Sequence, residues 1–195
     1  MEPTAHSVIQ AAAELDATLT RMGYPYCLIG GIAVQRWGEP RMTQDADATV
    51  LTDIVHDEPV VDQLLEHFQP RDNDARDFAL ARRVLLLYAS NQVPIDISLG
   101  ATKFEKNCIE RSSAWHYSET VTLNTCSAED LVTHKVFAGR EQDWLDVCTI
   151  LIRKNHALNL KLIRKELSPL LELKEDSEAL PRLEKLCREL KLDDA

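Results

Sequence analysis

The sequence predicts a mixed α/β fold, in which a β-sheet with flanking helices is followed by a helical C-terminal part. The first observation is that the β-prone runs come early, over residues 26–29, 45–51, 84–89, 93–99 and 115–125. The second is that Leu-rich, charged segments of helical period fill the remainder of the chain. We therefore expect a core domain over residues 1–126 and a helical region over residues 127–195 that packs on it.

The later strands have particular signals. A short turn at Asn91 and Gln92 separates the third run from the fourth, so these two runs should pair as an antiparallel hairpin. The last run predicts a weak edge strand, with Val121 and Leu123 facing inward. The sheet is therefore expected to contain an antiparallel pair in its interior.

The helices are predicted from capping residues and from apolar period. Thr4 is a suitable N-cap for a helix over residues 4–22, and Gly23 would end that helix. Ser127 begins another helix, which Gly139 interrupts. The other helices are expected over residues 31–37, 59–68, 75–82, 102–112, 140–153, 158–174 and 179–191.

Composition indicates a folded protein that does not enter a membrane. Hydrophobic residues make up 45% of the 195 residues, which is enough to build a core. No apolar run approaches the roughly 20 residues that span a bilayer. The N-terminal residues lack the pattern of a secretion signal, so we expect a cytoplasmic protein. The five cysteines lack C-x-x-C spacing, which argues against a zinc knuckle and predicts buried, reduced thiols.

The net charge of −10 makes the chain a poor general binder of nucleic acid. Neutralisation of phosphates supplies most of the affinity of such binders, and an acidic chain repels them. A local basic face would still allow contact with RNA. That face is expected on the C-terminal helices, from Arg153, Lys154, Lys161, Arg164 and Lys165.

Three aspartates could form a metal site. Side chains alternate along a strand, so Asp45 and Asp47 share one face of the run 45–51. Asp96 lies on the polar face of the run 93–99. If these two strands are neighbours, the three carboxylates converge, and carboxylate oxygens select Mg²⁺ or Mn²⁺. The alternative is that the aspartates are unrelated, solvated residues on an open sheet face.

Gly30 and Gly31 follow a strand and begin a helix. Glycine lets the backbone approach a ligand closely, and the start of a helix offers free N–H groups to phosphate. The alternative is a plain tight turn. Together with the three aspartates, the two glycines favour a phosphate site beside a metal site.

Two stretches resemble a known family. GGIAVQRWGEPRMTQDADATV is similar to the first motif of the polymerase-beta-type nucleotidyltransferase superfamily, and SAEDLVTHKVFAGREQDWLDVCTIL is similar to a later motif. The resemblance covers roughly residues 22–152 and points to the small prokaryotic branch that includes abortive-infection toxins of type IV toxin–antitoxin systems. It implies the nucleotidyltransferase fold for the core.

The resemblance also implies roles for individual residues. Asp45, Asp47 and Asp96 match the metal-binding carboxylates, and Lys135 matches a lysine expected to contact nucleotide phosphate. Further matches to nucleotide-binding positions are Gly30, Gly31, Arg41, Thr43, Arg140 and Asp143, and Asp146 completes the closing motif with an open role. The usual Gly-Ser of the superfamily is Gly-Gly in this chain. Without the resemblance, the charged residues from Lys135 to Asp146 read equally well as surface ion pairs.

The expected activity is transfer of a nucleoside monophosphate from a nucleoside triphosphate to an acceptor hydroxyl, with Mg²⁺ or Mn²⁺ as cofactor. Asp45, Asp47, Asp96 and Lys135 would be the catalytic residues. The acceptor stays open between an RNA 3′ end, a protein side chain and a small molecule. The resemblance adds a cognate antitoxin as a candidate partner. The rival expectation is a non-catalytic nucleotide-binding or antitoxin-like protein that uses the same fold.

Overall fold

The computed structural model describes residues 4–52 and 57–192 and divides the chain into two compact units. The first unit contains residues up to 32 together with 42–126, and the second contains 33–41 together with the residues from 127 onward. We describe each unit by itself. The expected packing of residues 127–195 on the core stays a prediction.

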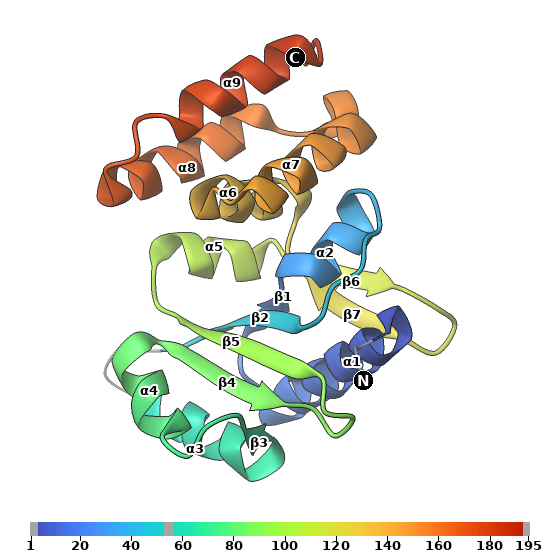
Figure 1. Ribbon diagram of the computed structural model, residues 1–195, viewed down its shortest axis with the longest axis vertical. Coiled ribbons are helices and arrows are strands. Elements are labelled where there is room, and N and C mark those ends of the chain that lie inside the picture. Colours follow the sequence, from blue (N-terminus) through green and yellow to red (C-terminus); the bar gives the residue numbers. More distant parts are fainter. Residues whose placement is uncertain (1–3, 53–56, 193–195) are drawn as a thin grey trace. The chain divides into compact units, whose positions relative to one another are not determined.

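The first unit is built on a mixed sheet (Figure 1). Its described strands are β1 (Tyr26–Leu28), β2 (Ala46–Leu51), β3 (Gln69–Pro70), β4 (Val84–Tyr88), β5 (Pro94–Gly100), β6 (Ser113–His116) and β7 (Thr122–Thr125). They are ordered β3-β4-β5-β2-β1-β7-β6 across the sheet. A mixed α/β fold was predicted, and this arrangement confirms it.

Strands β2 and β5 lie side by side at the centre of the sheet and run parallel. The predicted hairpin of β4 and β5 is confirmed, since the two strands pair antiparallel. Its turn is closed by hydrogen bonds from the Ala89 N–H to the Val93 carbonyl at 2.9 Å and from the Val93 N–H to Asn91 Oδ1 at 3.2 Å. The hairpin thus fixes β5, which brings Asp96 into the sheet.

Helices cover the apolar face of this sheet. The first is α1 (Ala5–Met22), which begins at the predicted N-cap Thr4 and ends at Gly23 with a left-handed φ of 76°. The core combines fully buried aliphatic residues of α1 with those of the central strands, such as Leu15 with Ala48 and Ile97. Helices α3 (Asp57–His67) and α4 (Ala75–Arg82) extend the same core. α5 (Lys103–Glu110) contacts β2 and β1.

The second unit is helical. It contains α6 (Ala128–Ala138), α7 (Glu141–Lys154), the short 3₁₀ helix η1 (Asn155–Ala157), α8 (Leu160–Lys174) and α9 (Ala179–Glu189). Residues 33–41, which include most of α2 (Gly30–Trp37), belong to the same unit. Gly38 lies against α7, since its carbonyl accepts a hydrogen bond from Arg153 at 2.5 Å. Ser127 and Gly139 cap α6 as predicted.

The expected single edge strand over residues 115–125 is wrong. Two strands, β6 and β7, form an antiparallel hairpin there, and β7 is an interior strand between β1 and β6. The turn between them is held by Ser118, whose hydroxyl accepts hydrogen bonds from the backbone of Thr120 and Val121. Leu123 is buried as predicted, because it lies on the core face of β7.

Two other expectations concern the whole described chain. All five cysteines are free thiols, and four of them are buried, which confirms the predicted reduced state of the chain. Over residues 4–52 and 57–192, no helix is both long and apolar enough to cross a bilayer. The cytoplasmic location stays a prediction.

Candidate functional site

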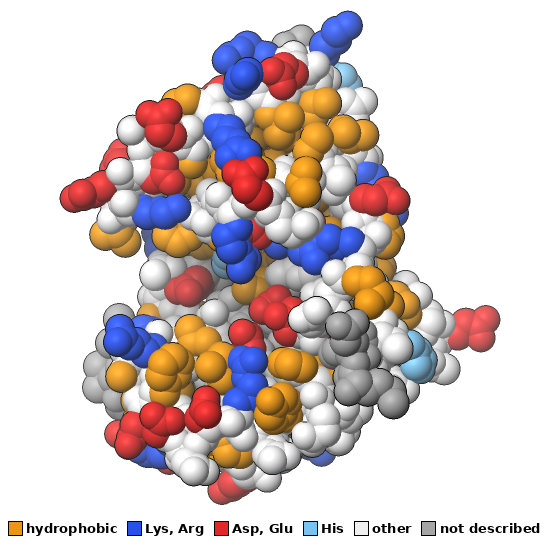
Figure 2. Space-filling model, in the orientation of Figure 1, with side chains coloured by type: hydrophobic (Ala, Val, Ile, Leu, Met, Phe, Trp, Pro, Cys, Tyr) orange, Lys and Arg blue, Asp and Glu red, His pale blue; other side chains and the backbone are white. Residues whose placement is uncertain are grey.

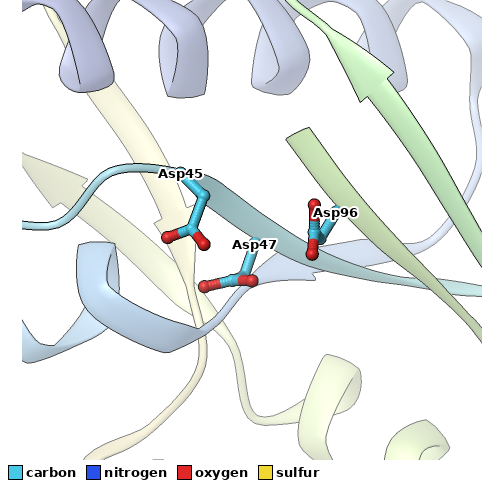
Figure 3. A group of neighbouring side chains, drawn as sticks. All are labelled: Asp45, Asp47 and Asp96. Atoms are coloured by element: carbon cyan, nitrogen blue, oxygen red, sulfur yellow. The ribbon is translucent and has the colours of Figure 1, made fainter. Parts of the chain in front are cut away.

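The three predicted aspartates converge on one patch of the first unit (Figure 3). Asp45 directly precedes β2, Asp47 lies within it, and Asp96 lies in β5. The parallel register places Asp47 beside Asp96, so both side chains leave the same face of the sheet. One carboxylate oxygen from each of the three residues lies within 4.8 Å of the others. All three side chains are half-buried.

This cluster has the chemistry of a hard-cation site. The three oxygen donors suit Mg²⁺ or Mn²⁺ and offer nothing to a soft metal. Burial raises the pKa of Asp96, Arg71 lowers it, and the nearby Asp45 raises it further, so that the net pKa lies above the ordinary value. The raised pKa reflects the cost of gathering negative charges, which a divalent cation would offset. The residues therefore fit the predicted metal.

Gly30 makes room for one of these carboxylates. It begins α2 with a φ of 58°, a left-handed conformation that favours glycine. A Cβ atom placed on Gly30 would lie 1.9 Å from Oδ2 of Asp47. A side chain at this position would therefore displace the Asp47 carboxylate. This close approach explains the first glycine better than a plain tight turn does.

Gly31 makes room for Thr43 in the same way. A Cβ atom at Gly31 would lie 2.3 Å from Oγ1 of Thr43. Thr43 is buried, and its hydroxyl donates a hydrogen bond of 3.0 Å to Oδ1 of Asp45. The departure from Gly-Ser therefore has a local cause, because a serine at position 31 would collide with the residue that orients Asp45.

Arg71 is a site residue that the sequence did not reveal. Its guanidinium Nη2 donates a short hydrogen bond to Oδ1 of Asp96. The backbone N–H of Arg71 is fixed by a hydrogen bond of 3.1 Å to the carbonyl of Leu86, the register partner of Asp96. No spacing rule links positions 71 and 96, so only the sheet order could have identified this contact.

A cavity of about 300 Å³ adjoins this patch. Leu86 is one of its lining residues and faces Asp96 directly across the β4–β5 pair. Phe78 also lines the cavity, although two-fifths of its side chain is exposed. The other lining residues are Asp72, Asp74 and Ala75. A ligand in this cavity would therefore lie next to the carboxylate cluster.

The remaining predicted charges form a second cluster in the helical unit. Lys135 Nζ lies 2.9 Å from Oδ1 of Asp143 and 2.9 Å from Oδ2 of Asp146. Arg41 binds both oxygens of Asp146, at 2.7 and 2.8 Å. Arg140 Nε donates to Oδ2 of Asp143 at 2.6 Å. We call these five residues the buried ion-pair cluster, because Lys135 and both aspartates are buried.

The cations of the buried ion-pair cluster keep its aspartates ionised. Burial raises the pKa of Asp143, but hydrogen bonds from Arg140 and Lys135 lower it more, and the net pKa is below the ordinary value. Burial likewise raises the pKa of Asp146, while Arg41 and Lys135 bring the net value below the ordinary one. Two of the three Lys135 donors are engaged here. Contact between Lys135 and a phosphate stays a prediction.

The predicted site residues thus fall into two groups. The glycines, Thr43 and the three aspartates belong to the first unit, whereas Arg41, Lys135, Arg140, Asp143 and Asp146 belong to the second. On the helical unit, acidic and basic side chains are interspersed on the face that Figure 2 shows. Within the predicted basic face, Arg164 is paired with Glu184 at 2.6 Å.

No family model and no curated protein matches this chain. Solved structures do. A nucleotidyltransferase-like antigenic protein from Paracoccidioides brasiliensis superposes with a TM-score of 0.55 at 14% identity, over 91% of this chain and 94% of that one. The antibiotic-resistance factor ANT(2'')-Ia gives a TM-score of 0.52 at 11% identity, over 93% and 99%. The lincomycin-bound lincosamide antibiotic adenylyltransferase LnuA gives 0.50 at 15%, over 77% and 98%. The chain therefore has the nucleotidyltransferase fold.

Proposed function

We propose that the protein is a Mg²⁺-dependent nucleotidyltransferase, which moves a nucleoside monophosphate from a nucleoside triphosphate to an acceptor hydroxyl. The observation that carries the proposal is the convergence of three carboxylate oxygens within 4.8 Å on neighbouring strands. Gly30 admits one of these carboxylates, and Thr43 orients another. The shared fold with two proteins named for antibiotic resistance or adenylyl transfer supports the same reading.

In this proposal Asp45 and Asp47 hold the cation that accompanies the triphosphate, and Asp96 completes the ligand set. Bound Mg²⁺ would supply charge neutralisation and acidify the acceptor hydroxyl. The acceptor oxygen attacks the α-phosphorus in line, the bond to the β-phosphate bridge breaks, and pyrophosphate leaves. Asp96 would receive the hydroxyl proton. The free N–H groups at the start of α2 would bind phosphate oxygens.

Nucleotide binding is also proposed for residues of the helical unit, namely Arg41, Lys135, Arg140 and Asp143. Lys135 retains one donor beyond its two aspartate partners, and that donor could reach a phosphate oxygen. The side chain of Arg140 is 76% exposed although it pairs with Asp143, so it could turn toward a ligand. These contacts would offset charge on the leaving pyrophosphate.

The acceptor is proposed to lie in the cavity of about 300 Å³ beside Asp96. The apolar side chains of Phe78 and Leu86 would contact a ring, and Asp72 and Asp74 make the cavity a poor place for phosphates. This favours a small-molecule hydroxyl over an RNA 3′ end or a protein side chain. LnuA, which shares the fold, is named an antibiotic adenylyltransferase. The resemblance to abortive-infection toxins supports a toxin–antitoxin role instead, with a cognate antitoxin as partner.

The test is mass spectrometry of RNA, protein and small molecules from cells that express the wild type or the Asp45→Asn/Asp47→Asn variant. A nucleotide adduct present only with the wild type is the expected result, and it would identify the acceptor. An identical set of species in both samples would contradict the proposal.

The rival function is non-catalytic nucleotide binding. It predicts that Asp47→Asn and the wild type respond equally to Mg²⁺, because no metal would be needed. The retention of Asp45, Asp47 and Asp96 in contact distance favours the enzyme, since a site without a metal would gain nothing from their mutual repulsion.

A further inference from the structure

We propose that Arg71 is a resident counter-ion of the metal site, which occupies Asp96 in the metal-free protein and competes with a cation bound there. The inference rests on the proposed function, because it assumes that Asp96 is a metal ligand. It adds a residue that neither the motifs nor the resemblance identified. It also assigns that residue a measurable effect on metal affinity.

The contact is built into the strand order. Arg71 follows β3 directly, and its backbone N–H is held by the carbonyl of Leu86 in β4. From this fixed point the side chain reaches past β4 to the carboxylate of Asp96 in β5. The side chains are 23% and 35% exposed, so the pair is partly shielded from water. A guanidinium on this tether cannot leave the neighbourhood of the site.

The guanidinium is not fully used by protein partners. Its Nε atom is buried and lacks a hydrogen-bond partner among the described residues. An arginine placed only to brace β3 would be expected to use both sides of its fork, as Arg76 does with Asp62 at 2.7 and 3.2 Å. Arg71 instead directs its Nη2 at a carboxylate of the metal cluster.

Charge gives this arrangement a consequence. Asp45 receives a neutral hydroxyl from Thr43, whereas Asp96 receives a full positive charge from Arg71. In the metal-free protein that charge reduces the repulsion among the three carboxylates. When a divalent cation binds, two positive groups share Asp96 and repel each other. Arg71 therefore stabilises the empty cluster and lowers its affinity for metal.

The test is calorimetric titration of Mn²⁺ into the wild type, Arg71→Gln, Arg71→Lys and the matched control Arg76→Gln, which breaks an exposed arginine–aspartate pair in the same unit. Removing a unit charge a few ångströms from a divalent ion should tighten Mn²⁺ binding about tenfold or more in Arg71→Gln. Arg71→Lys keeps the charge, and Arg76→Gln lies outside the cluster, so both should bind like the wild type.

The outcomes separate the two proposals. Equal or weaker Mn²⁺ binding by Arg71→Gln, with normal binding by the wild type, overturns the role of Arg71 and leaves the proposed function standing. Absence of Mn²⁺ binding in every protein overturns both. If Arg71→Gln unfolds without metal, recovery of its circular dichroism on adding Mn²⁺ supports the proposal. Failure to fold with Mn²⁺ as well would make Arg71 a structural residue and overturn it.

Discussion

The molecule contains two acid-rich clusters that differ in how their charge is balanced. In the first unit, Asp45, Asp47 and Asp96 bring three half-buried carboxylates together, and Arg71 contacts one of them. In the second unit, two buried aspartates lie among Lys135, Arg41 and Arg140. The first cluster keeps an excess of negative charge on an accessible sheet face. The second is internally compensated.

The difference shows which cluster can act on a ligand. A compensated, buried cluster gains little from an added cation, and its members position one another. A cluster with excess charge is stabilised by whatever cation it binds. The net pKa shifts follow this division, since the pKa of Asp96 is raised whereas those of Asp143 and Asp146 are lowered. Substitutions in the two clusters should therefore change different quantities.

The largest effect on folding is expected from Lys135→Met in the buried ion-pair cluster. It leaves Asp143 and Asp146 without their shared ammonium, and breaking a buried pair in this way costs about 3–5 kcal/mol. Arg140→Gln removes an exposed partner of Asp143 and should cost less than about 1 kcal/mol. Urea unfolding followed by circular dichroism measures both changes.

The double variant Lys135→Met/Asp143→Leu serves as the control. It removes both charges of one pair, so part of the lost stability should return. If Lys135→Met instead unfolds within about 1 kcal/mol of the wild type and loses nucleotide binding, Lys135 belongs to the ligand site and the contrast between the clusters fails.

A second prediction concerns the glycine that admits Asp47. Gly30→Ala places a Cβ atom where Oδ2 of Asp47 lies and should weaken Mn²⁺ binding about 10- to 100-fold, a typical cost of disturbing a ligand's support. Gly23→Ala has an equally left-handed φ of 76° but open space around its Cβ. It should cost about 1–2 kcal/mol of stability and leave Mn²⁺ affinity unchanged. Similar Mn²⁺ affinity in the two variants would refute the role of Gly30.

The smallest effect is expected from acid. Asp143 and Asp146 have lowered pKa values in the folded protein, so their contribution to stability is complete above the unfolded pKa of about 3.9. That contribution is lost as the pH falls below it through the folded pKa values. The facing groups Arg41, Lys135 and Arg140 stay charged throughout. The urea midpoint of the wild type should therefore fall from pH 6 to pH 3, and fall less in Lys135→Met/Asp143→Leu. Parallel curves would count against this cluster as the acid-sensitive element.

Much of the carboxylate site could be predicted because it depends on local rules. Alternation along a strand places Asp45 and Asp47 on one face, and a hairpin signal after residue 89 fixes the register of Asp96. Arg71 could not be predicted, because its contact depends on the order of strands that are distant in sequence. The turn after Tyr117 was missed, because it lacks the Gly, Asn or Pro of common hairpin turns.

The buried ion-pair cluster was predictable in pairing but not in depth. Three-residue spacing places Asp143 and Asp146 on one helix face. Their burial depends on what packs over that face. Arg41 comes from residues 33–41, a segment remote in sequence from α7, and it binds Asp146 through both of its oxygens. Such a contact has no signature in either stretch alone.

The most direct test of the central claim is calorimetric titration of the four ribonucleoside triphosphates with Mg²⁺ into the wild type, Asp47→Asn and Asp62→Asn. Asp62 is the matched control, an exposed aspartate paired with Arg76 in the same unit. We predict saturable, Mg²⁺-dependent binding of at least one nucleotide by the wild type and Asp62→Asn, weakened more than about 100-fold in Asp47→Asn. Equal binding by Asp47→Asn, or no binding of any nucleotide by the wild type, would contradict the assignment of the three aspartates to a metal-dependent nucleotide site.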